Sequence, residues 1–499
     1  MSEKLGKRPV RGGFRLFLAL TLVAGFTVGC STDEPTFTAP KTAALYTFMG
    51  DAPACDVLAL RANVNGLAFR PAGAQNTTVT IFPTGSLFVS LRMDYAALRD
   101  FSTVMYLSTL RVDSYDRAAV TFQLPRLVVY DPSQDPPVRA MDAIFPSSSF
   151  VVSLQPEFKV TETAINVLRF DFDVAKSLQF DSQGQVTDRV NPVVTAVAVP
   201  KGVDNTFGSF DNLVGFVSSV SPNPVGSFIG SFNLQLHTGS GQALPISLKS
   251  DTVLSGMTDL KSLETGRIAE VMIKVDDAGN FVADSVLVGE RVNVSERKIA
   301  FYGVVLPTPV KDANGNVTQL SLYLRGMDPD QSRDIARDSV LTVDIPSGAA
   351  FRISPRPDGL TPLDFGPASV AIGQEVMVFG EYTLNSNLPP VVTAESVTLR
   401  SQTLQGGLSS LVEVASDGRT GAFWLSGCSS MLQTTPIMVM TTITHTDFIN
   451  VFGLSELSPQ ATLYVRGFPY YVKDATVIEG IPVPAGTLVL FARQVRQVN

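Results

Sequence analysis

Short apolar or alternating runs, each ended by turn-forming residues, recur along most of this chain and constrain its fold more than any other feature. A strand places successive side chains on opposite faces of a sheet, so runs of roughly four to eight such residues between turn signals are typical of β-strands. Turn signals are plentiful, because the 499 residues include 38 glycines and 32 prolines. Hydrophobic residues make up 45% of the chain, which allows a large core. The pattern therefore predicts an all-β protein.

The first block of such runs spans residues 43–200 and is predicted to form a β-sandwich domain. Turns such as Asp131-Pro132 and Asp135-Pro136-Pro137 separate its runs at the spacing that favours two packed sheets. Two short stretches, residues 95–101 and 174–178, are candidates for helical turns. The runs expected to be strands are residues 44–49, 57–64, 78–82, 87–91, 119–124, 126–130, 150–154, 164–172 and 193–199.

Three motifs in this block resemble the family known as domain of unknown function 4382. They are Gly50-Asp51-Ala52-Pro53 with the following Asp56-Val57-Leu58, the run Phe170-Asp171-Phe172-Asp173-Val174-Ala175-Lys176-Ser177-Leu178, and Asn191-Pro192-Val193-Val194. The resemblance implies an exported all-β domain, common in bacterial lipoproteins, for which no activity is established.

Residues 226–499 form a loose internal repeat. Each copy combines a strand that begins with glycine, a second apolar strand, a short Leu-rich turn, and a glycine followed by two more strands. Copies of about 70 to 100 residues suit small barrels that close their own edges. We expect a linker over residues 201–225, because Asp204-Asn205-Thr206 and Ser221-Pro222-Asn223-Pro224 have linker or turn chemistry. The expected modules are residues 226–296, 297–400 and 401–499, and the third is the most degenerate.

These copies resemble domain of unknown function 5666, a small β-barrel module often repeated in exported proteins. The resemblance rests on Gly266-Arg267-Ile268-Ala269-Glu270-Val271 with Val282-Ala283-Asp284-Ser285-Val286. The same pattern recurs as Gly373-Gln374-Glu375-Val376-Met377-Val378 with Thr393-Ala394-Glu395-Ser396-Val397. The expected architecture is thus an N-terminal β-sandwich followed by about three small β-barrel-like modules.

The first 30 residues have the layout of a bacterial lipoprotein signal. Five basic residues precede an apolar run over residues 16–29, which is too short to remain as a transmembrane helix. Gly29 is the small residue before the expected cut, and Cys30 is the expected acceptor of diacylglycerol and, on its freed amine, of a further acyl chain such as palmitate. Residues 1–29 are therefore a predicted signal peptide. The alternative is an ordinary secretory signal cut elsewhere, with Cys30 incidental, since Thr27 and Val28 depart from the usual lipoprotein box.

Residues 30–42 are rich in Ser, Thr, Pro and Asp and are expected to be a flexible tether that lifts the folded part about 40 Å from the membrane. Removal of residues 1–29, which carry five Lys/Arg and one Glu, changes the net charge from −8 to −12. An acidic chain with few basic clusters is a poor binder of nucleic acid, and an anionic membrane surface would repel it. The expected location is the cell envelope, facing the periplasm or the exterior, with the lipid on Cys30 as the anchor. If the cell is Gram-negative, the expected membrane is the outer membrane.

Asp171 and Asp173 are the only acidic pair in the first block that we single out for chemistry. They alternate with Phe170 and Phe172, so both carboxylates are expected on one face of a strand with the rings in the core. The pair is interpreted as a solvated or structural face, with calcium binding and acid–base catalysis on a glycan as the alternatives. Neither a catalytic residue nor a cofactor is assigned.

The other chemistry-bearing residues have structural interpretations. His237 and His445 are far apart and lack partners at metal spacing, and whether Cys55 and Cys428 pair is left open. The segments 276–280 and 312–316 superficially resemble calcium loops but are interpreted as hairpin turns, since Asn and Gly tolerate positive φ. The aromatic group of Phe468, Tyr470 and Tyr471 is either core or a platform for sugar rings.

These features together favour a lipid-anchored envelope protein that binds a polysaccharide or an envelope protein without catalysis. We expect the β-sandwich nearest the lipid and the barrels extended from it as a string. The alternatives are a carbohydrate-active enzyme and a calcium-dependent adhesin that use acidic residues of the first block.

Overall fold

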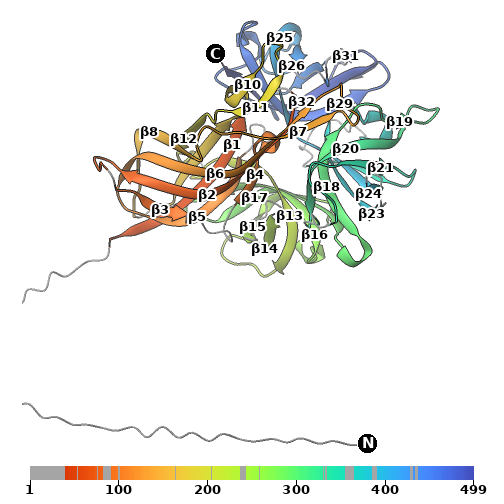
Figure 1. Ribbon diagram of the computed structural model, residues 1–499. Coiled ribbons are helices and arrows are strands. Elements are labelled where there is room, and N and C mark those ends of the chain that lie inside the picture. The colour runs from red at the N-terminus through yellow and green to blue at the C-terminus, as the bar shows by residue number, and fades with distance from the viewer. Residues whose placement is uncertain are drawn as a thin grey trace, which may run out of the picture. The chain divides into compact units, whose positions relative to one another are not determined.

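The computed structural model describes residues 40–498 except for 53, 55, 76, 83–90, 99–101, 163, 204, 237–242, 258, 330, 332–333, 355–364, 385–389, 428–430 and 433–436. Strands dominate these residues (Figure 1), and helices α1 (Tyr95–Leu98) and α2 (Val174–Ser177) are single turns within the two stretches predicted for them. The prediction of an all-β fold is confirmed. Among the described residues, no helix is long and apolar enough to cross a membrane.

The first block forms a β-sandwich. One sheet has the order β12-β9-β1-β5, in which β9 runs parallel to β1. The other has the order β3-β2-β6-β7, with β4 paired to β2 and β8 paired to β6, and β10 and β11 form a separate hairpin. The strands are β1 (Thr42–Ala52), β2 (Val57–Pro71), β3 (Val79–Phe82), β4 (Leu91–Asp94), β5 (Ser102–Arg111), β6 (Ser114–Tyr130), β7 (Val138–Asp142), β8 (Ser149–Lys159), β9 (Asn166–Asp173), β10 (Leu178–Phe180), β11 (Val186–Val190) and β12 (Val194–Ala198).

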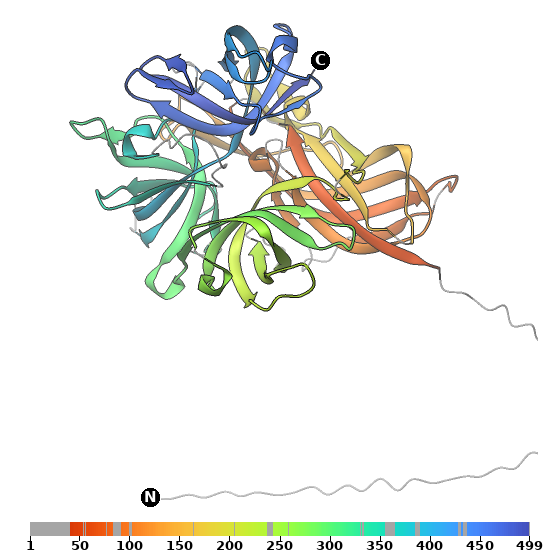
Figure 2. The same cartoon turned by 180° about the vertical axis from the view of Figure 1, so that it is seen from behind.

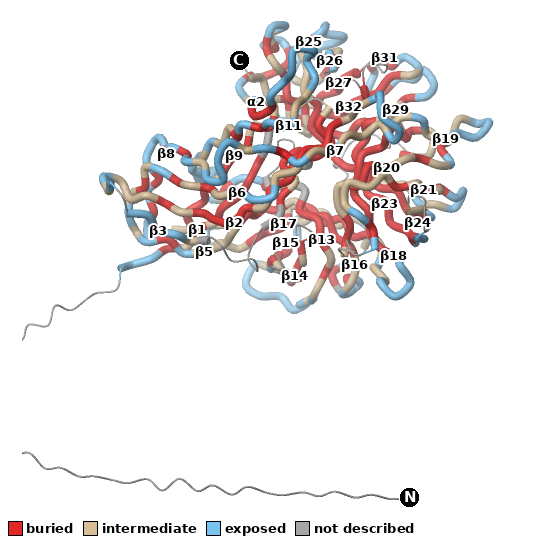
Figure 3. Tube along the Cα trace, in the orientation of Figure 1, coloured by how far each residue is buried: buried red, intermediate tan, exposed pale blue. Residues whose placement is uncertain are grey.

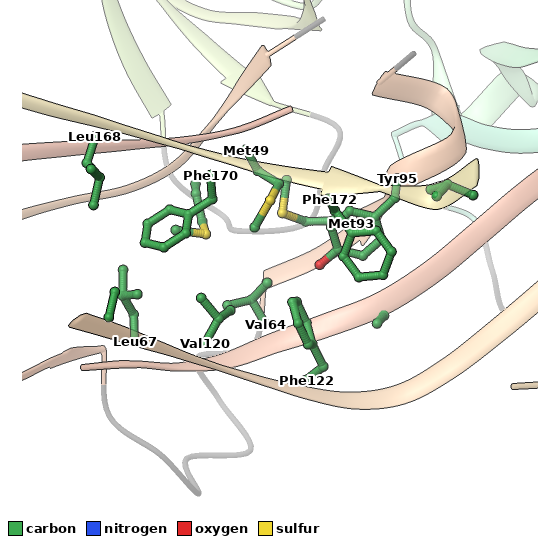
Figure 4. Packing of buried hydrophobic residues seen from close by; sticks show 14 of the residues in the cluster. Met49, Val64, Leu67, Met93, Tyr95, Val120, Phe122, Leu168, Phe170 and Phe172 are labelled. Atoms are coloured by element: carbon green, nitrogen blue, oxygen red, sulfur yellow. The ribbon is translucent and has the colours of Figure 1, made fainter. Parts of the chain in front are cut away.

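The core of the sandwich follows from the alternation of apolar residues along both sheets. Phe170 and Phe172 of β9 point toward Val120 and Phe122 of β6 (Figure 4), and all four side chains are buried. Tyr95 of α1 stacks on Phe172 with ring centroids 4.5 Å apart. Burial of aromatic side chains of this size adds roughly 1.5–3 kcal/mol each to the free energy of unfolding, so this cluster is a main source of the domain's stability.

Three small barrels follow the sandwich, each made from consecutive strands. Figure 2 shows the first in yellow-green. The first consists of β13 (Ser209–Ser221), β14 (Gly230–Leu236), β15 (Ala243–Ser255), β16 (Arg267–Val275) and β17 (Phe281–Arg291). The second consists of β18 (Lys298–Val305), β19 (Val310–Lys311), β20 (Val317–Asp328), β21 (Val340–Asp344), β22 (Ala350–Ser354), β23 (Glu375–Thr383) and β24 (Val391–Arg400). The third consists of β25 (Gln402–Val414), β26 (Gly421–Gly427), β27 (Ile437–Thr441), β28 (Asp447–Ile449), β29 (Thr462–Val472), β30 (Thr476–Ile478), β31 (Ile481–Val483) and β32 (Thr487–Val498).

All three barrels share one strand order. In the first barrel, β13-β14-β15-β17-β16 closes by pairing of β16 with β13, and β15 runs parallel to β17. The second barrel repeats the ring as β18-β20-β21-β24-β23, and the third as β25-β26-β27-β32-β29, again with the third and last strands parallel. The order 1-2-3-5-4, closed on itself, is that of the OB-fold, a five-stranded Greek-key barrel.

The glycine and the Leu-rich turn of the repeat meet in the structure. Each barrel has a 3-10 turn before its fourth strand: η1 (Leu260–Ser262), η3 (Pro367–Ser369) and η4 (Leu454–Glu456). In the first barrel a side chain at Gly230 would collide with Leu260, and in the third a side chain at Gly421 would collide with Leu454. In the first and third barrels glycine is therefore required where the second strand begins, because a Cβ would overlap the leucine of the 3-10 turn and, at Gly421, also the Glu413 carbonyl oxygen.

The stretch expected to be a linker, residues 201–225, instead contains β13, the first strand of the first barrel. Ser221-Pro222-Asn223-Pro224 is the turn from β13 to β14, since Pro and Asn serve tight turns as well as linkers. Leu213 and Val217 on β13 are buried in the barrel core. The expected first module, residues 226–296, would lack this strand, so its predicted start at residue 226 is wrong.

The barrels also do not form a string, because residues 41–499 are one compact unit. Part of the outer face of the sheet β12-β9-β1-β5 is apolar, and Phe48, Val104 and Val167 on it share a core with the first barrel. Phe48 stacks on Phe210 of β13 with ring centroids 3.8 Å apart. A buried cluster also joins the first and second barrels through Ile268 and Tyr302. Figure 3 shows in red how burial follows the strands throughout this unit.

Candidate functional site

Asp171 and Asp173, the acidic pair singled out from sequence, each make local contacts. The Asp171 carboxylate pairs with Arg169 at 3.0 Å. Asp173 caps α2 by accepting a hydrogen bond of 2.9 Å from the backbone N–H of Lys176, whose ammonium is also 2.9 Å from it. A carboxylate at a helix N-terminus is a structural device that stabilises the turn by about 1 kcal/mol. Calcium binding and catalysis by this pair stay predictions.

Segments 276–280 and 312–316, interpreted from sequence as hairpin turns, join antiparallel strands and are hairpin turns. Asp276 accepts hydrogen bonds from the backbone N–H groups of Ala278 (2.9 Å) and Asn280 (2.8 Å), and Asp312 makes the equivalent bonds to Asn314 and Asn316. The backbone hydrogen bond from Asn316 is the main reason that the pKa of Asp312 lies below its usual value. Within the described part of the chain, no group of three His, Cys, Asp or Glu residues could hold a metal ion.

The other residues singled out from sequence lie in cores, in a turn, or outside the residues that the structure describes. Phe468 is buried in the core of the second barrel, and Tyr470 is partly buried against that core and against the cluster beneath β30–β31. Tyr471 is partly buried against the core of the third barrel, so the three rings do not form one exposed platform. His445 lies in the turn after β27. Cys30, Cys55, Cys428 and His237 lie outside the described residues.

The shared strand order directs attention to the outer face of the second and third strands, which is where OB-fold barrels bind oligonucleotides and oligosaccharides. The three barrels differ in what lies on this face. One of the three faces is open, and the other two are covered.

In the second barrel, the β-sandwich covers this face. Tyr323 on β20 is fully buried against Leu58 and Val128 of the sandwich. Its hydroxyl donates a hydrogen bond of 2.9 Å to Asp338, and Arg325 Nε donates one of 2.7 Å to the Leu58 carbonyl. Burial is the main cause that raises the pKa of Tyr323, so its hydroxyl stays protonated and donates.

A buried ionic network accompanies this contact. Arg61 of β2 donates to Asp338 and lies 3.2 Å from Asp94, and its Nη2 donates to the Arg325 carbonyl at 2.8 Å. Burial alone would raise the pKa of Asp338, but Arg61 and hydrogen bonds from Arg126 and Tyr323 outweigh it and hold that pKa below its usual value. Asp94 differs, because burial raises its pKa despite the neighbouring arginines.

In the third barrel, the chain covers its own face. The hairpin β30–β31, which lies between the fourth and fifth strands, packs Ile478 and Ile481 on Met438 and Met440 of β27. Trp424 of β26 packs at the edge of the same cluster. The part of this face on β27 is therefore covered as a second hydrophobic core, and at its edge Trp424 of β26 stays partly exposed and Ser426 exposed.

The first barrel leaves its face open. The outward residues of β14 are Ser231, Asn233 and Gln235, none of which is buried, and they alternate with buried Phe232 and Leu234. On β15, Pro245 and Ser247 lie opposite Asn233 and Ser231. The four hydroxyl and amide side chains of this face have no hydrogen-bond partner among the described residues. We call Ser231, Asn233, Gln235, Pro245 and Ser247 the open face.

None of the five residues of the open face is charged, and Lys249 follows Ser247 at the next outward position of β15, so one cation lies beside this face. Its hydroxyls and amides both donate and accept hydrogen bonds, which suits a ligand whose groups do the same. The sequence signal was present in Ser-Phe-Asn-Leu-Gln-Leu, where apolar and uncharged polar residues alternate. Sequence reasoning missed these residues because the other two barrels carry comparable alternation on faces that are covered.

No family model matches this chain, and no curated protein matches it.

Proposed function

We propose that this chain is a lipid-anchored protein of the bacterial cell envelope that binds a neutral polysaccharide and does not transform it. The layout of residues 1–30 supports the anchor and the envelope location. The observation that carries the binding function is the open face, the one uncovered and uncharged second-and-third-strand face among the three described barrels.

Charge favours a neutral glycan over nucleic acid. Binding of a phosphate backbone depends on several Lys and Arg residues, and Lys249 is a single cation beside the open face on a chain whose net charge is −8. An anionic polysaccharide would meet the same repulsion. A neutral glycan needs no counter-charge, and its hydroxyls match the donors and acceptors of Asn233, Gln235 and the two serines.

Side-chain chemistry also favours a glycan over a protein partner. Protein interfaces take most of their energy from buried Trp, Tyr and Arg anchors, and none of the five residues of the open face is of these types. For the enzyme and the adhesin alternatives, the described residues give no support, because Asp171 and Asp173 are held in separate local contacts.

The test is the binding of the detergent-solubilised full chain to insoluble neutral and anionic polysaccharides in pull-down titrations. The double variant Asn233→Ala/Gln235→Ala should bind the neutral polymer about 30-fold more weakly, since two hydrogen bonds contribute about 1 kcal/mol each. The matched control is Asn191→Ala/Gln460→Ala, which removes one exposed Asn and one exposed Gln outside the open face. Equal binding by both double variants would refute the proposal.

A further inference from the structure

A cleft of about 320 Å³ lies in the β-sandwich, beside β25 of the third barrel. Its walls come from the end of β6, from β7, from the β10–β11 hairpin and from Gln405 of β25. No residue of the first barrel lines it, so it is separate from the open face. Its volume is at the lower end of the range of roughly 300–1,000 Å³ that small-molecule sites occupy.

Asp131 and Arg139 form an ion pair that lines the cleft. Each of the two side chains is also held by a hydrogen bond to a neighbouring residue. Asp131 accepts hydrogen bonds from the Ser133 hydroxyl (2.6 Å) and the Ser133 backbone N–H (3.0 Å), and the hydroxyl bond is the main reason that its pKa is lowered. Arg139 Nη2 donates to the Val186 carbonyl at 2.8 Å, and Arg139 Nε is 3.6 Å from the Asp131 carboxylate. The guanidinium and the carboxylate are thus held in place before any ligand arrives.

One donor in this ion pair is unused. Arg139 Nε is buried and has no hydrogen-bond partner among the described residues. The Arg139 side chain as a whole is 33% exposed, so a ligand would meet the guanidinium through its other N–H groups. Asp131 offers acceptor positions beside this donor, so the pair matches two neighbouring hydroxyls, one accepting and one donating.

The lining of the cleft also has an apolar and aromatic part. Phe180 on β10 is 57% exposed, although the preceding Leu178 of the same strand is buried. Leu178 and Val186 also line the cleft. An exposed ring beside planar polar side chains is the arrangement that holds a pyranose, because the ring covers the C–H face of the sugar while the polar groups bind its hydroxyls.

The charge of the lining selects among sugars. Asp56 and Asp131 supply two carboxylates and Arg139 one positive charge, so the lining is acidic overall. Burial, and secondarily Asp56, raises the pKa of Tyr130, which keeps its hydroxyl protonated as a donor. A uronic acid or a sugar phosphate would be repelled, whereas an uncharged pyranose would not.

We infer that this cleft is a binding site for a single uncharged pyranose unit, held by Asp131 and Arg139 through its hydroxyls and by Phe180 through its C–H face. This inference rests on the proposed function for the class of ligand, a neutral glycan. It adds a second binding site, which lies on the sandwich. A chain that binds one sugar unit in the cleft and a polymer surface on the open face would gain affinity from two linked contacts.

The test uses the detergent-solubilised full chain and monosaccharides, which are too small to report on the open face as a whole. Glucose, galactose, mannose, N-acetylglucosamine and glucuronic acid are titrated to about 20 mM with saturation-transfer NMR as the readout. At least one neutral sugar should bind, and glucuronic acid should not. Phe180→Ala should weaken that binding at least about tenfold, because the ring loses its contact with the sugar face.

The matched control is Phe452→Ala, which removes a phenylalanine that is 84% exposed and lies before η4, outside the cleft. It should bind the sugar as the unchanged chain does. Absence of binding by all four neutral sugars, equal loss in both phenylalanine variants, or preferred binding of glucuronic acid would overturn the inference. Asn233→Ala/Gln235→Ala should leave monosaccharide binding intact, so failure of the cleft and failure of the open face are distinguishable.

Discussion

Replacement of Arg61 by methionine should destabilise the contact between the sandwich and the second barrel. The Arg61 side chain is 5% exposed and serves Asp94, Asp338 and the Arg325 carbonyl together. Removal of one partner of a buried ion pair costs about 3–5 kcal/mol, because the other charge is left buried and unpaired. We expect the lower end, about 3 kcal/mol, because Asp338 keeps Arg126 and Tyr323 as partners.

The assay is thermal unfolding of the full chain, followed by intrinsic fluorescence. For a cooperative unit of 150–250 residues, about 3 kcal/mol corresponds to a fall in Tm of roughly 6–12 °C. The control is Arg169→Met, which breaks the half-exposed pair with Asp171 and should cost about 0–1 kcal/mol. A Tm for Arg61→Met within about 2 °C of the control would refute the reasoning.

A second variant separates the loss of a charge partner from the loss of packing. Arg61→Met/Asp94→Leu/Asp338→Asn removes the whole buried network, and asparagine tolerates the positive φ of 66° at position 338. It should recover at least half of the lost Tm, since replacement of a complete buried network is often close to neutral. A triple variant less stable than Arg61→Met alone would show that the arginine acts mainly through packing.

Two further predictions concern acid stability and the anchor. The folded pKa of Asp338 lies below its ordinary value of 3.8, so the unfolded chain takes up this proton first as the pH falls. The stabilisation that the ionised Asp338 gives the folded chain is therefore present above about pH 4 and is lost below it. Asp338→Asn should lower Tm at pH 7, and its Tm should fall less steeply than that of the unchanged chain between about pH 4 and 2. Parallel curves of Tm against pH would contradict this. Cys30→Ala should move the protein from the membrane pellet to the soluble or precursor fraction and abolish labelling by a palmitate analogue, and unchanged pelleting and labelling would exclude Cys30 as the lipid site.

The all-β fold, the two helical turns and the hairpin turns could be predicted because each depends on neighbouring residues. Alternation in Phe170-Asp171-Phe172-Asp173 sets which side chains enter the core, and Asp-x-x-Gly-x closes a turn by its own hydrogen bonds. The glycine and leucine of the repeat could also be noticed from sequence. Their contacts in the first and third barrels, Gly230 with Leu260 and Gly421 with Leu454, appear only in the folded chain.

The start of the first barrel could not be predicted, because turn residues such as Ser221-Pro222-Asn223-Pro224 have the same chemistry in a linker and in a hairpin. Only pairing of β13 with both β14 and β16 decides between them.

The candidate sites depend even more on tertiary structure. Gln235 and Tyr323 occupy outward positions on equivalent strands, β14 and β20, yet one is open and the other is buried beneath the sandwich. The cleft likewise joins Asp56, Phe180 and Gln405, which are far apart in sequence. The sequence by itself determined which residues alternate and where the chain turns, since these are local properties. The tertiary structure decided which faces are covered, because burial depends on what distant segments pack against them.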